Sequence, residues 1–285
     1  MNDDSDVSIG ARIMQIHDAL TAGEQRLASV ILELDGNFSG FTASELAARA
    51  NVSNPTAARF FRRLGYENYQ QARTHARDQA SLGSPLVALQ RRHRIGDVDY
   101  DLGRYAEHEI LNLRRTMAEI SGEKLHAAVQ MLREARKIRI VAFRNSVLIA
   151  LYLRAQLSLL HDNVQVLPQL GMAMGEDVAT MGAEDLLVVV GMRRRPPVLT
   201  QLMRAALERN AKVLQLTHIG APASPNPSVL TLRCVVDGAG IFDSYSTALC
   251  VANCLVSLLE QSMGPGVAER LANIEALRKD IDGIG

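Results

Sequence analysis

Five short apolar runs in the second half of the chain constrain its fold more than any other feature. Each run is rich in β-branched residues, and a stretch with helical spacing separates it from the next. The runs are KIRIVAF (137–143), VQVL (164–167), DLLVVV (185–190), KVLQL (212–216) and LTLRCVV (230–236). Strands that alternate with helices form a parallel sheet with helices on both faces. We expect these helices near residues 146–161, 172–181, 198–209 and 243–262.

The first part of the chain shows only helical spacing, which predicts an all-α domain. Apolar residues at this spacing indicate helices over 11–20 and 23–34. Thr42 to Glu45 forms a capping box, in which a hydroxyl and a carboxylate each satisfy a backbone N–H, and it predicts a helix over 43–50. A short turn over 51–53 leads to the next helix. Two short helices joined by such a turn are typical of a helix-turn-helix, whose second helix enters the major groove of DNA.

The second helix of this pair is expected to begin at Asn54 or Pro55 and to end near Leu64 and Gly65. At about 100° per residue, its apolar side chains share one face and its polar side chains share the other. The predicted DNA-binding residues are Ser53, Asn54, Thr56, Arg59, Arg62 and Arg63. Between residues 49 and 77 the chain holds six arginines and one acidic residue. Because the net charge of the whole chain is zero, this local basic patch must provide the attraction to DNA.

The segment FTASELAARANVSNPTAARFFRRLGY (41–66) resembles the helix-turn-helix of the RpiR/MurR-type transcriptional regulators. The resemblance is carried by Thr42, Glu45, Leu46, Ala47, Val52, Ser53, Thr56, Arg59, Phe60, Leu64, Gly65 and Tyr66. Pro55 is less usual in this pattern. The second domain of these regulators is a SIS (sugar isomerase) domain, which agrees with the expected strands. The resemblance therefore implies a DNA-binding regulator that senses a metabolite.

Ligands of open parallel sheets bind beyond the carboxyl ends of the strands, near helix N-termini. The resemblance implies a phosphosugar held by two loops of small and hydroxyl residues. In this chain an Arg-Asn-Ser sequence and an arginine run stand there instead, and guanidinium groups bind carboxylate or phosphate. We predict that a small anionic metabolite, a phosphosugar, sugar acid or carboxylate, is bound by Arg144, Asn145, Ser146, Arg193, Arg194, Arg195 and Ser244. The alternatives are a solvated arginine loop and, for residues 243–246, capping of the last helix or contact with a second subunit.

The predicted domains are a helix-turn-helix DNA-binding domain over 1–80, a linker over 81–97 and a SIS-like effector-binding and dimerisation domain over 98–285. The polar helical stretch from Gln70 to Arg94 is interpreted as linker. The predicted partners are double-stranded DNA, the metabolite and further copies of the chain. A homodimer or homotetramer is expected because one helix-turn-helix makes few base contacts. The helices over 98–120 and 246–259 are its candidate surfaces.

A phosphosugar isomerase is the main alternative function, because SIS domains also serve catalysis. It needs a positioned acid and base, for which Glu176, His161 and His218 are the candidates. A nicotinamide enzyme is disfavoured because no G-x-G-x-x-G follows the first strand. We therefore expect no enzymatic activity, no cofactor and no metal.

The three cysteines are an odd number in apolar surroundings, which favours core packing in a reducing cytoplasm. Cys250 and Cys254 share a helix face, but no further metal ligand stands at the required spacing. The acidic start lacks the features of a signal peptide, and no apolar run reaches the roughly 20 residues that span a bilayer. We expect a cytoplasmic protein without membrane contact. The effector, the operator and the direction of regulation stay open.

Overall fold

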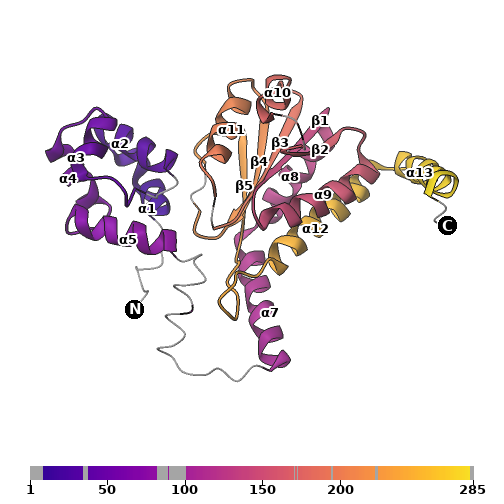
Figure 1. The fold of residues 1–285 in the computed structure, drawn as a ribbon, viewed down its shortest axis with the longest axis horizontal. Helices are drawn as coiled ribbons and strands as arrows, with labels where there is room; N and C mark the ends of the chain where they lie inside the picture. The colour runs from indigo at the N-terminus through magenta and orange to yellow at the C-terminus, as the bar shows by residue number, and fades with distance from the viewer. Residues whose placement is uncertain are drawn as a thin grey trace.

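The computed structural model describes residues 9–34, 38–81, 89, 101–169, 171, 173–193, 195–221 and 224–282. One part is a group of helices and the other is a sheet covered by helices (Figure 1). The predicted linker over 81–97 lies outside the described residues, apart from Ser81 and Leu89. The two parts are therefore described separately, and the domain boundaries at 80 and 98 stay predictions.

The first part confirms the predicted helix-turn-helix. Its elements are α1 (Ile9–Ile16), the 3-10 turn η2 (His17–Ala19), α2 (Ala22–Glu33), α3 (Ala43–Arg49), α4 (Asn54–Arg63) and α5 (Tyr69–Ser81). The predicted capping box is present: the Thr42 hydroxyl accepts from the Glu45 N–H at 3.2 Å, and the Glu45 carboxylate accepts from the Thr42 N–H at 2.7 Å. Asn51 in the turn has a φ of 51°, a left-handed conformation that Asn tolerates better than most residues.

An aromatic core holds these helices together. Phe38, Phe60 and Phe61 are fully buried. The Phe61 ring lies 5.7 Å from that of Phe38 and 5.4 Å from that of Phe60, within the range of favourable aromatic pairs. The interpretation of the polar stretch from Gln70 onward as linker is wrong for its first part. Ala72 and Ala76 of α5 are buried in the same core, so a narrow face of small residues is enough to dock the helix.

The second part contains five parallel strands in the order β2-β1-β3-β4-β5, as the apolar runs predict. They are β1 (Lys137–Ala142), β2 (Val164–Leu167), β3 (Asp185–Gly191), β4 (Lys212–His218) and β5 (Val229–Cys234). The helices are α7 (Leu102–Glu119), α8 (Gly122–Glu134), α9 (Ser146–Leu160), α10 (Met174–Ala179), α11 (Val198–Leu207), α12 (Ser246–Met263) and α13 (Gly266–Asp282). The chain order reverses between β1 and β3, which is the topological switch point of such sheets.

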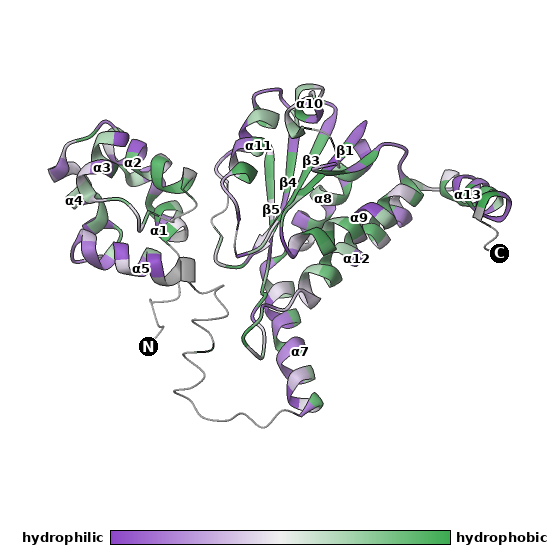
Figure 2. Ribbon diagram, in the orientation of Figure 1, coloured by the Kyte–Doolittle hydropathy of each residue, from purple (hydrophilic) through white to green (hydrophobic). Residues whose placement is uncertain are grey.

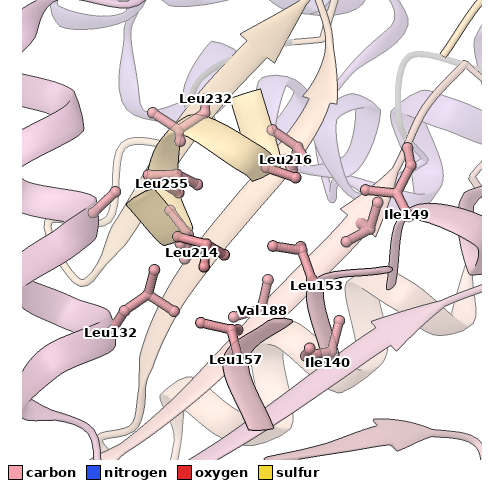
Figure 3. Close-up of a cluster of buried hydrophobic side chains, with 14 of the residues drawn as sticks. Leu132, Ile140, Ile149, Leu153, Leu157, Val188, Leu214, Leu216, Leu232 and Leu255 are labelled. Atoms are coloured by element: carbon pink, nitrogen blue, oxygen red, sulfur yellow. The ribbon is translucent and has the colours of Figure 1, made fainter. Parts of the chain in front are cut away.

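Alternate residues of each strand enter separate cores on the two faces of the sheet. Ile140 and Val188 pack with residues of α8, α9 and α12, including Leu132, Leu157 and Leu255 (Figure 3). Val141 and Val189 point to the opposite face, where α10 and α11 cover them. Because both faces are covered, the strands are apolar along most of their length (Figure 2).

Two expectations about the C-terminal helices are wrong. The helix α13 was not expected from the sequence, and most of its residues are exposed. Residues 243–246 therefore open α12, which is not the last helix. Arg270 of α13 donates to the carbonyl oxygens of Leu159 at 3.0 Å and Ser158 at 2.8 Å, so it caps the end of α9.

The expectation of core packing for all three cysteines is also wrong. Cys234 is buried, whereas Cys250 and Cys254 are exposed. The reason is that α12 packs through Ala248, Ala252 and Leu255, which leaves both cysteines on its outer side.

Across the described ranges, no group of three or more His, Cys, Asp or Glu residues could hold a metal ion. None of the helices described here has the length and hydropathy needed to cross a membrane.

Candidate functional site

The helix α4 presents a basic outer side because its apolar side is fixed in the core. Ala57, Phe60 and Phe61 are buried, whereas Arg59 and Arg62 are exposed on the opposite side. Among the described residues, the guanidinium group of neither arginine forms a hydrogen bond or an ion pair. Both guanidinium groups are thus available to a polyanion.

The N-terminal turn of α4 is built by hydroxyl groups. Ser53 is the N-cap, and its hydroxyl accepts from the Thr56 N–H at 3.3 Å. The Thr56 hydroxyl lies 2.9 Å from that of Ser53, and Pro55 occupies the first turn. Ser53 and Asn54 are exposed and Thr56 is half-buried. This end of α4 offers polar side chains and backbone N–H groups to a ligand.

Arg63 has a different position from its neighbours. Its guanidinium lies 2.8 Å from the buried carboxylate of Glu24 in α2, and it also donates to the Ala19 carbonyl at 2.7 Å. Burial opposes ionisation of Glu24, but hydrogen bonds from Thr21 and the charge of Arg63 hold its pKa below the ordinary value. Arg63 therefore ties α4 to the start of the domain. Sequence reasoning missed Glu24, which stands 39 residues away.

The turn after α4 explains the Leu-Gly-Tyr sequence. Gly65 has a φ of 87°, a conformation that favours glycine, and an added Cβ would lie 3.1 Å from the Arg12 guanidinium. Arg12 donates to the Leu64 carbonyl at 3.1 Å and lies 5.1 Å from the centre of the Tyr66 ring. The end of α4 is therefore fixed by α1, which orients its exposed arginines.

The predicted ligand residues lie at the carboxyl edge of the sheet, the edge where the parallel strands end. Arg144, Asn145 and Ser146 follow β1, and Arg193 and Arg195 follow β3. The backbone N–H of Met192 donates to the buried Ser146 hydroxyl at 3.4 Å, so the structure brings the two loops together at the switch point. Arg144 is exposed, with a φ of 57°. Arg194 lies outside the described residues.

Arg193 is held by two carboxylates that sequence reasoning did not assign to it. It forms an ion pair with Asp237 and a second with Asp243, whose Oδ1 lies 3.1 Å from its Nε. Both acids stand in the segment that joins β5 to α12. Local sequence gives no signal for this pairing, because Asp237 is 44 residues from Arg193.

Arg195 and His218 lie deeper at the same edge. Arg195 donates to the Thr217 hydroxyl at 3.4 Å, and Thr217 donates to the Gly191 carbonyl at 2.7 Å. Burial lowers the pKa of Arg195 to about 10, so it stays charged at neutral pH. Burial, with the charges of Arg195 and Arg193, lowers the pKa of His218 to about 3. Its Nδ1 is buried without a hydrogen-bond partner among the described residues.

Ser244 lies at the same edge but is bound within the protein. Its hydroxyl donates to Glu109 of α7 at 2.9 Å and lies 3.1 Å from the Ser246 hydroxyl. Tyr245 is close to this group, and burial, aided by the charge of Asp243, raises its pKa. The edge therefore brings together residues that follow β1, β3 and β5 with residues of β4 and α7.

The two histidines considered as acid and base for an isomerase do not meet. His161 lies before β2, where its Nε2 donates to the Ala135 carbonyl at 2.6 Å and its Nδ1 accepts from the Asn163 N–H at 3.1 Å. That position is the amino edge of the sheet, whereas His218 ends β4 at the carboxyl edge. Glu176 is exposed on α10. The two histidines are thus at opposite ends of the strands.

Comparisons with known proteins agree with this architecture. A model of the helix-turn-helix domain of the rpiR family matches residues 8–82, and a SIS domain model matches residues 131–257. The HTH-type transcriptional regulator HexR of Pseudomonas aeruginosa is 28% identical over 206 residues, which are 72% of this chain and 71% of that protein. The Bifunctional protein glk of Paraburkholderia xenovorans is 24% identical over 227 residues, which are 79% of this chain. The chain spans only 35% of the length of that protein.

The fold is also found among solved structures. The Vibrio vulnificus NanR protein complexed with ManNAc-6P has a TM-score of 0.56 and 19% identity, covering 96% of this chain and 98% of that one. At this identity the likeness shows the fold alone. The chain carries a helix-turn-helix domain of the rpiR family and a SIS domain, and over both it is similar to the transcriptional regulator HexR.

Proposed function

We propose that this chain binds operator DNA through α4 and that an anionic metabolite at the carboxyl edge of the sheet changes this binding. The observation that carries the first part is the pair of exposed arginines, Arg59 and Arg62, on a helix whose other side is fixed in an aromatic core. Phosphate contacts supply much of the affinity for DNA, and contacts to base edges supply the specificity.

Each residue of the proposed DNA contact has its own role. Ser53, Asn54 and Thr56 stand at the N-terminal turn of α4, the part of a recognition helix that contacts base edges. Arg59 is proposed to contact a base and Arg62 a phosphate. Arg63 was predicted from the sequence to contact DNA as well, but its bond to Glu24 supports a positioning role.

The proposed ligand is a phosphosugar, a sugar acid or a small carboxylate. The support is the cluster of guanidinium groups at the switch point, where open parallel sheets bind ligands. Arg144, Arg193 and Arg195 would hold the anion, and Asn145 with the hydroxyls of Ser146 and Ser244 would contact polar groups of the ligand. Arg194 stays a prediction. The likeness to a NanR protein complexed with ManNAc-6P favours a phosphosugar within this class.

A thermal-shift screen over phosphosugars, sugar acids and carboxylates tests this ligand class, because a ligand stabilises the state that it binds. Arg144→Ala should weaken the affinity for the best compound about tenfold, the value of one charge-assisted contact, and so reduce the thermal shift at a given ligand concentration. The matched control is Arg204→Ala on α11, an exposed arginine away from the carboxyl edge. Equal responses from both variants would contradict the proposed ligand site.

We also propose a homodimer or homotetramer. Leu102 of α7 is 82% exposed and Met117 is 73% exposed, and Tyr105, Ile110 and Leu111 on the same helix are exposed as well. A group of this kind on one helix favours a protein contact. Leu148 on α9 and Leu249 on α12 extend the exposed apolar surface of the domain. Sedimentation should find no monomer at micromolar concentration, and a monomer with and without DNA would contradict the proposal.

A regulator without catalytic activity accounts for the molecule better than an isomerase. The separation of His161 from His218 removes one acid–base pair considered for catalysis, and Glu176 is exposed on α10. The proposed DNA partner implies a cytoplasmic location in a bacterial cell. If the purified protein interconverted an aldose phosphate and a ketose phosphate, this proposal would be wrong.

A further inference from the structure

We propose that Asp237 is an internal anion that occupies Arg193 and ties it to α7, so that a ligand anion must displace it. This inference rests on the proposed anion site and adds how that site is connected to the rest of the domain. Arg193 is the link, because its guanidinium is both a predicted ligand group and the partner of two carboxylates.

Four contacts hold Asp237, and three of them come from α7. Its carbonyl oxygen accepts from His108 Nε2 at 2.8 Å and from Asn112 Nδ2 at 2.6 Å. Its carboxylate lies 3.5 Å from Arg115 Nη1 and forms the ion pair with Arg193. Asn112 is only 1% exposed, so the main chain of Asp237 is fixed to a buried face of α7.

The segment after β5 folds back so that both carboxylates reach Arg193. The Ser244 N–H donates to the Val236 carbonyl at 3.0 Å and closes the loop. Within it, a Cβ on Gly238 would lie 1.8 Å from the Phe242 carbonyl oxygen, so only glycine permits this close approach. Asp237 and Asp243 are therefore brought side by side by backbone geometry.

The arrangement makes occupation of Arg193 and the position of α7 interdependent. An anion that takes the guanidinium competes with the Asp237 carboxylate, and displacement of this carboxylate also disturbs its ion pair with Arg115 of α7. By linkage, a shift of α7 that withdraws Asp237 equally favours the anion. Since α7 is the first helix after the predicted linker, this connection offers a route from the ligand site toward the DNA-binding domain.

The test uses inorganic phosphate as the probe and the full chain. Calorimetric titration should show that Asp237→Asn binds phosphate about tenfold more tightly than the wild type, because one of the two carboxylates that pair with Arg193 loses its charge while the amide keeps the shape. The control is Asp162→Asn, an exposed carboxylate whose partner is Arg270 of α13. It should leave the affinity unchanged.

Hydrogen exchange of α7 amides gives a second readout. Phosphate should speed exchange at residues 108–119 of the wild type and should have no further effect in Asp237→Asn. If Asp237→Asn does not fold, Arg115→Gln takes its place: this variant should still bind phosphate, with a weaker response in α7. A folded Asp237→Asn variant with wild-type affinity, or wild-type binding without any change in α7, would overturn the inference alone. Failure of the wild type and of Asp237→Asn to bind phosphate would instead remove the proposed anion site, and the inference with it.

Discussion

The helix α4 and the carboxyl edge of the sheet both carry closely spaced arginines, but these arginines have different partners in the two regions. On α4, Arg59 and Arg62 are exposed and only Arg63 is paired inside the domain. At the sheet edge, Arg193 is held between Asp237 and Asp243. The comparison teaches that the role of an arginine depends on the carboxylate that the fold brings to it. An arginine surface with few carboxylate partners suits a polyanion. An arginine surface with several suits a ligand anion that competes with these carboxylates for the guanidinium groups.

The largest expected effect tests whether the helical domain and the sheet have independent cores. Phe61→Ala should destabilise the helical domain by about 3–5 kcal/mol, because Phe61 is fully buried against Phe38, Phe60 and Tyr69. Among the described residues, the sheet shares no core residue with this cluster. Amide hydrogen exchange should show lost protection over 9–81 and unchanged protection in β1, β3 and β4. Loss of protection in both regions together would contradict the comparison.

A smaller effect distinguishes the contributions of the α4 arginines to stability. Arg63→Ala should lower the free energy of unfolding by about 1–3 kcal/mol, because it removes a partner of the buried Glu24 carboxylate. Arg59→Ala is the matched control on the same helix and should change stability by less than about 0.5 kcal/mol. Denaturant unfolding followed by circular dichroism measures both. Equal stabilities would mean that Arg63 is a surface residue like Arg59.

Particular residues show how far the sequence could predict the molecule. The strands and α4 were predictable because their signals are local: alternation with helices for the strands, and caps with an aromatic face for α4. The pairs Arg63–Glu24 and Arg193–Asp237 were not, because the partners are 39 and 44 residues apart. Asn112 of α7 is 125 residues from Asp237. Such contacts depend on how the helices and strands pack together, and the spacing of residues along the chain does not predict them.

A pH dependence sharpens the description of the sheet edge. The pKa of His218 is about 3 in the folded chain, below its ordinary value of 6.5. Between these values the unfolded chain binds one more proton, so stability falls as pH drops from 6.5 toward 3, by up to about 1.4 kcal/mol per pH unit. His218→Gln should reduce this slope by about 1.4 kcal/mol per pH unit, which corresponds to one proton. Urea unfolding at a series of pH values measures the slope. An unchanged slope would mean that His218 is protonated in the fold.

The smallest effect concerns the salt dependence of DNA binding. Arg62→Ala should weaken binding to specific and nonspecific DNA alike and reduce the salt slope by about one unit, because one phosphate contact is lost. Arg204→Ala on α11 should leave the slope unchanged. Fluorescence anisotropy at several salt concentrations measures it. A slope unaffected by Arg62→Ala would remove this residue from the DNA contact.

The central claim is that α4 of this chain reads DNA, and retention of its own upstream DNA by the purified protein tests it most directly. The wild type should retard this fragment in preference to unrelated DNA of equal length. Arg59→Ala should weaken the specific complex by about 1–3 kcal/mol, the value of one base contact, with fold and oligomeric state unchanged. Equal retention of both fragments by the wild type, or full specific retention by a folded Arg59→Ala and Arg62→Ala double variant, would contradict the claim.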